Sequence, residues 1–532
     1  MDIHSFNSIR RKPVMARNMV ASSQPLASQA GANAFARGGN AIDAALAAAI
    51  AITVVEPTMN GIGGDAFAIL WDGERLHGMN GSGRAPAGWN LERFAGKTAM
   101  DTRGWETVTV PGQVAAWADL SDRFGDLPFE DLFEDAIRYA MDGFPVSPVI
   151  ARQWEMSAQE LHVQPGFDAF MPNGRAPKAG EIWRCADQAV TLREIARTHG
   201  RSFYEGRLAH HITEFAAIHG AALSMEDLAE HQTEWVEPIS QAYGDVRVHE
   251  IPPNGQGIAA LIALGILSYL PYGETAVGSA ARVHLEIEAM RCAFADLYAH
   301  ITDPNHMRVK PEDLLKPAYL KARAALIDPK KAGVYPAGQP ENGGTIYLCA
   351  ADAQGRMISY IQSNYKGFGS GVVVPGTGIA LHSRGNSFSL DPSHPNVVAG
   401  RKKTMHTIIP AFMTTADGQP LMAFGVMGAN MQAQGHVQMT LRVSVEGLNP
   451  QAASDAPRWR IIDSGELIME AEWPESVLRE LRDMGHDLTV EPNNSLEFGS
   501  AQLIARLDTQ RGETVAYVGG SDARRDGQVS PY

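Results

Sequence analysis

The sequence predicts a mixed α+β protein in which both halves of the chain contribute to one body. Between residues 130 and 325 the apolar residues mostly follow helical spacing. Residues 345–430 instead contain short β-rich runs separated by Gly and Pro turns. Strand signals also precede residue 130, so strands lie on both sides of a loose linker, Asp328–Asn342, which is rich in Pro, Gly and Lys. This distribution favours a shared fold over two independent domains.

The N-terminal region predicts a short strand and two Ala-rich helices within residues 14–55, broken at Gly38-Gly39-Asn40. Asn40 is suited to cap the second helix. That helix, residues 41–55, is the most apolar stretch, but it is shorter than the ~18 residues of a membrane span and contains Asp43. We therefore expect a buried helix there, followed by a buried strand at residues 66–71.

The composition and the charge of the chain disfavour several classes of function. The formal net charge of the 532 residues is −15, which disfavours nucleic acid and anionic membranes as partners. The first twenty residues lack the apolar core of a secretory signal. The three cysteines, Cys185, Cys292 and Cys349, form no CxxC pair and are expected to be small buried side chains, in keeping with a cytoplasmic protein.

Familiar cofactor motifs do not occur in the sequence. The glycine-rich stretches at residues 367–378 and 425–430 lack the GK[ST] of a phosphate loop, and no HExxH or EF-hand pattern occurs. No metal or other cofactor is therefore expected. The second stretch, GVMGAN, lies between a predicted strand and a predicted helix, where backbone N–H groups are suited to stabilise an oxyanion.

The stretch from Gly343 to Gly371 carries the main chemical hypothesis. Gly343-Gly344-Thr345 precedes a predicted hairpin with a DAQG turn at residues 352–355. If the chain is cut before Thr345, the new α-amine, with a pKa of about 7.7–8.0, becomes a base for the threonine hydroxyl. The same hydroxyl would make the cut by attacking the Gly344 carbonyl. Spacing alone also allows a plain loop–strand junction.

The wider sequence resembles the γ-glutamyltranspeptidase family of N-terminal nucleophile hydrolases. The resemblance runs through nearly the whole chain, and its motifs include GGNAIDAALAA (38–48), TVPGQVAAW (109–117), IPPNGQGIAAL (251–261), GGTIYLCAADAQGRMISYIQSN (343–364) and GLNPQAASDAPRWR (447–460). It implies a proenzyme cut between Gly344 and Thr345 into a large subunit (1–344) and a small subunit (345–532). The two would jointly form a four-layer αββα sandwich.

The same resemblance implies roles for individual residues. Thr345 is the expected nucleophile and Ser363 its hydrogen-bonding hydroxyl partner. Gly428 and Ala429 match the family's Gly-Gly oxyanion pair; the second glycine is replaced, but its backbone N–H remains. The positions that hold a γ-glutamyl group in the transpeptidases differ here, since Ser387 replaces the acidic residue that binds the α-ammonium. The residues expected to shape the substrate pocket are Arg384, His406, Thr407, Tyr365, Ser387 and Arg84.

A pocket with cations and without that acid favours a small acyl group bearing a carboxylate and no α-amine. Oxamate, giving oxalate and ammonia, is the first expectation, and a glutaryl amide or cephalosporin acylase activity also fits. A γ-glutamyl or glutathione hydrolase or transpeptidase with a rearranged pocket remains an alternative. So does an unprocessed binding protein on the same fold. The expected partners are a small amide and the two subunits of one precursor, which could dimerise further.

Overall fold

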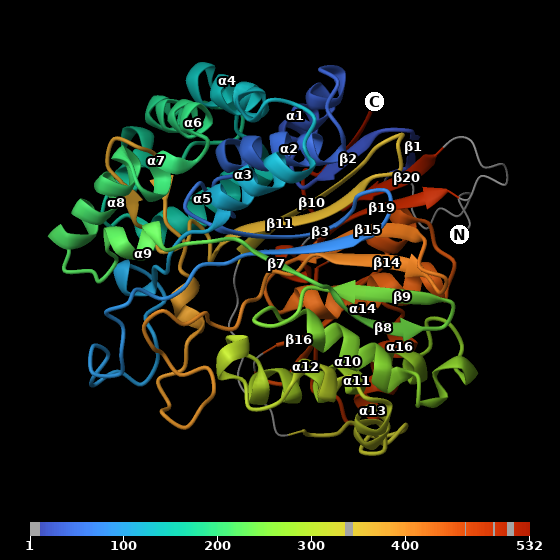
Figure 1. Cartoon of the computed structure of the whole chain (residues 1–532). Coiled ribbons are helices and arrows are strands. Elements are labelled where there is room, and N and C mark those ends of the chain that lie inside the picture. The colour runs from blue at the N-terminus through green and yellow to red at the C-terminus, as the bar shows by residue number, and fades with distance from the viewer. Residues whose placement is uncertain (1–10, 336–343, 463, 493–494, 508–514) are drawn as a thin grey trace.

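The computed structural model describes residues 11–335, 344–462, 464–492, 495–507 and 515–532. Two seven-stranded sheets lie face to face, and helices cover the outer face of each (Figure 1). The predicted αββα sandwich is therefore confirmed. Both sheets contain strands from before and after Gly344, so the two halves of the chain share one body.

The first sheet carries the predicted cut site on a central strand. All of its neighbouring strands pair antiparallel, with β10 between β2 and β11. Its order is β21 (Gln528–Pro531), β2 (Met19–Ser22), β10 (Gly344–Ala351), β11 (Met357–Tyr365), β3 (Asp65–Trp71), β4 (Leu76–Gly81) and β7 (Glu234–Val236).

The second sheet carries the predicted oxyanion turn at the end of β15. It too is antiparallel throughout. Its order is β1 (Val14–Ala16), β20 (Ala516–Ser521), β19 (Ser500–Leu507), β15 (Pro420–Met427), β14 (Ala411–Thr415), β9 (Val246–Glu250) and β8 (Ile239–Tyr243).

The two sheets come into close contact beside the cut site. Tyr347 of β10 is fully buried and packs over Gly425 of β15, where an added Cβ would lie 2.5 Å from the ring. Glycine therefore allows the ring to fill the space between the sheets. This packing brings the beginning of β10 and the end of β15 together.

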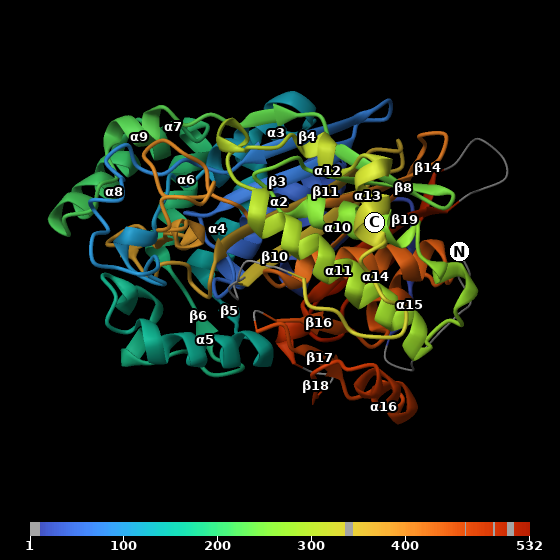
Figure 2. The ribbon, with the colours of Figure 1, turned by 90° about the horizontal axis from the view of Figure 1, so that it is seen from below.

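Helices form the two outer layers (Figures 1 and 2). The first sheet is covered by α1 (Pro25–Ala36), α2 (Ala41–Val55) and α3 (Gln113–Phe124), and the second by α10 (Gly257–Leu267), α11 (Ala280–His300), α14 (Met431–Ser444) and α15 (Pro450–Asp455). Helix α2 is buried along its whole length and begins in a capping box between Asn40 and Asp43, as the sequence predicts for this cap.

Shorter elements extend the sandwich. The additional helices are α4 (Glu134–Asp142), α5 (Pro148–Leu161), α6 (Ala186–Thr198), α7 (Arg201–Tyr204), α8 (Arg207–Ile218), α9 (Met225–Ala229), α12 (Pro311–Leu314), α13 (Pro317–Ala324) and α16 (Glu475–Asp483). Two short strand pairs also form: β5 (Phe144–Pro145) pairs with β6 (Ile182–Trp183), and β12 (Val373–Val374) pairs with β13 (Ile379–Ala380). Strands β16 (Trp459–Ile461), β17 (Leu467–Glu470) and β18 (Leu488–Glu491) form a small sheet at one edge (Figure 2).

Most predicted elements form as expected, including the hairpin of β10 and β11. Strand β14 begins only at Ala411, because the N–H groups of the preceding Ile408 and Ile409 bond to side chains rather than to a strand. The three cysteines are buried and unpaired, as predicted. Residues 336–342 of the predicted linker, and Gly343 after it, lie outside the described part of the chain. Within that part, no helix is both long and apolar enough to cross a membrane.

Candidate active site

Thr345 is the second residue of β10, and its side chain is fully buried. Its hydroxyl makes two hydrogen bonds. Thr345 Oγ1 donates to Ser363 Oγ at 3.3 Å, and Gln432 Nε2 donates to Thr345 Oγ1 at 3.2 Å. Ser363 Oγ in turn accepts the Tyr365 N–H at 2.7 Å. The structure thus joins the predicted nucleophile to its predicted hydroxyl partner.

An irregularity in strand pairing lies opposite Thr345. Gly344 pairs with Tyr365 and Ile346 pairs with Gln362, so β11 holds one more residue than β10 in this interval. A β-bulge of this kind re-aims side chains that would otherwise alternate regularly. Here it accompanies the contact between the Thr345 and Ser363 hydroxyls.

The predicted oxyanion residues form a tight turn between β15 and α14. Gly428 has φ +123° and Ala429 has φ +51°, a value that a residue with a Cβ rarely adopts. The Ala429 carbonyl accepts from Gln256 Nε2 at 2.8 Å, and the same amide donates to the Thr407 carbonyl at 2.5 Å. Gln256 therefore ties the turn to the segment that carries Thr407.

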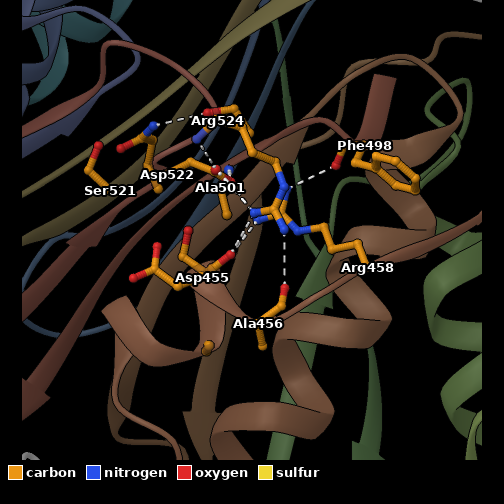
Figure 3. A network of polar contacts seen from close by, with 12 residues as sticks. Asp455, Ala456, Arg458, Phe498, Ala501, Ser521, Asp522 and Arg524 are labelled. Carbon is orange, nitrogen blue, oxygen red and sulfur yellow. Dashed lines mark hydrogen bonds and ion pairs between the residues drawn. The ribbon is translucent and has the colours of Figure 1, made fainter. Parts of the chain in front are cut away.

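A buried ionic network surrounds Arg458 (Figure 3). Arg458 binds Asp522 at 2.5 Å and donates to the Phe498 carbonyl at 2.9 Å. The next residue, Gly499, packs against Gly428, since a Cβ on Gly428 would lie 3.0 Å from the Gly499 Cα. Arg458 therefore holds the chain one residue away from the contact with Gly428.

Arg384 is the buried cation of the predicted substrate pocket. Its side chain is 1% exposed, its Nη1 donates to Thr407 Oγ1 at 2.9 Å, and its guanidinium lies 4.2 Å from the centre of the Tyr365 ring. Nε and Nη2 have no hydrogen-bond partner within the described structure. Burial lowers the pKa of Arg384 to about 10, so the group stays charged at neutral pH.

Asp65, which the sequence reasoning did not single out, holds His406. Its carboxylate lies 3.0 Å from His406 Nε2 and 3.2 Å from His382 Nδ1. Burial alone would raise the pKa of Asp65, but the two histidines outweigh it and hold that pKa well below its usual value. The signal in the sequence was an acidic residue at the beginning of a predicted buried strand. In the sheet, Asp65 pairs with Ser363 on the neighbouring strand.

The structure places protein groups against both ring nitrogens of His406, one of the residues predicted to shape the substrate pocket. Its Nε2 faces Asp65, and its Nδ1 accepts the Ile408 N–H at 3.3 Å, so both ring nitrogens are occupied. Burial and the positive charge of Arg384 lower the pKa of His406 to about 3. His406 is therefore neutral, and its contacts position the neighbouring Thr407.

Arg84, the other arginine predicted to shape the substrate pocket, makes its contacts away from Arg384. Its guanidinium pairs with Glu234 at 3.0 Å and with Asp303 at 3.1 Å, and its side chain is 40% exposed. It lines a separate recess beside Lys403. These two carboxylates already satisfy the charge of Arg84.

A cavity of about 380 Å³ opens beside Tyr365 and Thr407, the two residues that contact Arg384. Tyr365, Ser387 and Thr407 line it, and the Ser387 hydroxyl has no hydrogen-bond partner within the described residues. Its apolar wall consists of Met100, Leu297, Ile301, Phe388, Leu390 and Met405. Of the described residues that line it, one carries a carboxylate: Asp391, which is exposed and bonded to Ser393.

Three buried side chains elsewhere in the protein are of types that bind metal ions. The ligand atoms of His284, Glu288 and His486 lie within 4.8 Å of one another. However, His284 is bonded to His486 at 2.8 Å and to the Asp328 carbonyl at 2.9 Å, while Arg291 lies 3.5 Å from Glu288. These contacts and the nearby guanidinium disfavour a metal cation there.

Comparison with known proteins agrees with this geometry. The family described as Gamma-glutamyltranspeptidase matches residues 27–532. The chain is 35% identical to a glutathione hydrolase-like YwrD proenzyme of Bacillus subtilis, covering 96% of this chain and 98% of that protein. It is also 35% identical to an oxamate amidohydrolase proenzyme of Klebsiella pneumoniae, with 98% and 99% coverage.

Among solved structures, a cephalosporin acylase from Bacillus halodurans superposes with a TM-score of 0.92 at 45% identity, covering 100% of this chain and 99% of that one. The match extends over both sheets and both helical layers, so the fold is that of the N-terminal nucleophile hydrolases. The chain belongs to the gamma-glutamyltranspeptidase family and is an enzyme that acts on amides.

Proposed function

We propose that the protein is a self-processing N-terminal-threonine amidohydrolase that cleaves small amides whose acyl group carries a carboxylate. The observation that carries this proposal is the buried Arg384, which has two N–H donors without a partner among the described residues. Such donors are costly to bury unless a ligand uses them. A carboxylate is the group whose two oxygens match them.

Processing begins with the Thr345 hydroxyl. Its oxygen attacks the Gly344 carbonyl carbon, the peptide C–N bond breaks, and the hydroxyl proton passes to the Thr345 nitrogen. Water then hydrolyses the ester and frees the Gly344 carboxylate. The products are a large subunit (1–344) and a small subunit (345–532), which stay together because strands from each lie in both sheets.

Turnover uses the same oxygen with the new α-amine as base. The amine takes the hydroxyl proton as Oγ1 attacks the substrate amide, and the N–H groups of Gly428 and Ala429 stabilise the oxyanion. The proton passes to the leaving nitrogen, which departs as ammonia or an amine. Water hydrolyses the acyl ester and restores the hydroxyl. No cofactor enters this scheme.

The residues of the pocket also indicate which acyl groups the enzyme accepts. An α-ammonium would need a buried counter-charge, and Ser387 supplies only a neutral hydroxyl. Oxamate is the smallest substrate that satisfies these conditions. The apolar wall of the cavity favours a longer member of the class, such as a glutaryl amide. The name of the oxamate amidohydrolase relative supports the first candidate, and the cephalosporin acylase relative supports an enzyme that acts on larger amides.

Two experiments test the proposal. Purified protein should give two bands of about 37 and 20 kDa, in proportion to 344 and 188 of the 532 residues that together weigh 57.4 kDa. The Thr345→Ala protein should remain one band. An uncut, inactive wild type would instead indicate a binding protein. Product release should then be compared for oxamate, glutaryl amide and glutathione, and a preference for glutathione would contradict the assigned acyl class.

A further inference from the structure

A glutamine from outside the predicted site lies against the nucleophile. Gln432 belongs to the first turn of α14 and is fully buried. Its Oε1 accepts the Ile409 N–H at 3.0 Å, and its Nε2 lies 3.2 Å from Thr345 Oγ1. Because the Ile409 N–H requires an acceptor, the amide orientation is fixed and its NH₂ end faces Thr345.

The hydrogen bonds around Thr345 show that Gln432 acts as a hydrogen-bond donor to the Thr345 hydroxyl oxygen. The Thr345 proton points to Ser363, so the bond from Gln432 must reach a lone pair on Oγ1. An amide NH₂ donates and does not accept, and it therefore does not serve as the base. It does stabilise negative charge on the oxygen that it contacts.

We propose that Gln432 is a catalytic residue that stabilises Thr345 Oγ1 whenever this oxygen carries negative charge. This inference rests on the proposed function, in which Oγ1 loses its proton as it attacks and is expelled when water cleaves the ester. The Gln432 donor acts at both moments, in processing and in turnover. It complements the Gly428 and Ala429 N–H groups, which act on the carbonyl oxygen instead.

The test uses Gln432→Glu, which has nearly the same shape and keeps an oxygen for the Ile409 N–H but places an acceptor against Oγ1. The matched control is Gln438→Glu on the same helix, a buried glutamine whose amide bonds to Trp459 and Gln434. Removing one oxyanion donor costs roughly 10²–10³ in kcat. We expect a loss of that order for Gln432→Glu, with KM within about threefold of wild type and processing slowed similarly.

The pH profile separates catalysis from packing. The carboxyl introduced by Gln432→Glu regains a donor when it is protonated, so the activity of this variant relative to wild type should rise as pH falls. Gln438→Glu should process and turn over at rates within about threefold of wild type, and its relative activity should show no such rise. Near wild-type activity of Gln432→Glu, or a flat relative profile, would overturn the assignment.

The second variant, Gln432→Met, removes the donor without adding a charge and guards against misfolding of the first. Near wild-type kcat in Gln432→Met would likewise overturn the inference, whereas a fall in kcat at constant KM supports it. Failure of the proposed function itself has a different signature. In that case the wild type stays uncut, or Thr345→Ala retains activity.

Discussion

Replacing Arg384 by methionine tests the carboxylate pocket at its centre. A substrate carboxylate that uses Nε and Nη2 makes two charge-assisted hydrogen bonds, each worth about 1.5–3 kcal/mol. Removing one partner of such a buried charge pair costs about 2–5 kcal/mol. With about 1.4 kcal/mol per factor of ten, kcat/KM for glutaryl amide should fall roughly 30-fold to several thousand-fold.

The comparison substrate is the same acyl amide ending in a neutral carboxamide instead of the carboxylate. It already lacks the charge, so its kcat/KM should change less than about fivefold. The assay is initial-rate release of ammonia by processed enzyme. Equal losses for both substrates would refute the idea that Arg384 recognises the carboxylate.

Stability gives an independent check on Arg384→Met. Each buried N–H without a partner costs about 1–3 kcal/mol, so removing two offsets the lost bond to Thr407 and the lost stacking on Tyr365. In the uncut Thr345→Ala chain, the free energy of unfolding should stay within about 1 kcal/mol of its parent or rise.

The matched control is Arg442→Met. Arg442 is also buried, and burial likewise lowers its pKa to about 10, but its guanidinium binds the carbonyls of Ala453, Ala456 and Pro457. Its loss should cost at least about 2 kcal/mol because those carbonyls lose their donors. Urea titrations of the three chains measure the difference. Equal destabilisation by both substitutions would contradict the view that Arg384 is held ready for a ligand.

Three further predictions concern Ser363, Ala429 and His406, and their stability measurements use the same uncut chain. Ser363→Ala should lower the free energy of unfolding by about 1–3 kcal/mol, because the buried Tyr365 N–H loses its acceptor; an unchanged urea midpoint would contradict this. Ala429→Gly should leave stability unchanged or raise it by up to about 1 kcal/mol by relieving the positive φ, and in the processed enzyme it should keep kcat within about threefold, since the N–H remains. A tenfold fall in kcat would show that the methyl group matters. His406 has a folded pKa of about 3, below its ordinary 6.5, so its contribution to stability is present above pH 6.5 and lost on acidification toward pH 3. His406→Gln should therefore reduce the slope of unfolding free energy against pH in that interval by about 1.4 kcal/mol per pH unit, and an unaltered slope would mean that His406 is protonated in the folded chain.

Local patterns were enough to predict much of the architecture. The Asn40 cap, the α2 helix and the β10–β11 hairpin depend on neighbouring residues, and each forms as predicted. The beginning of β14 at Ala411 instead depends on the bonds of Ile408 and Ile409 to His406 and Gln432, which strand propensity does not encode.

The sequence by itself pointed to the place where we propose that chemistry begins, a threonine behind two glycines at a predicted strand end, and the family resemblance added Ser363 as its expected hydroxyl partner. Only the tertiary structure decided what surrounds that threonine. Gln432 contacts it across 87 residues of sequence, and Asp65 holds His406 across 341. Arg84 and Arg384 both looked suited to bind a carboxylate, yet one is paired with two carboxylates and the other keeps two donors that no described residue accepts. Residue type sets what a side chain is able to bind, but the charges packed against it determine whether that capacity is already used.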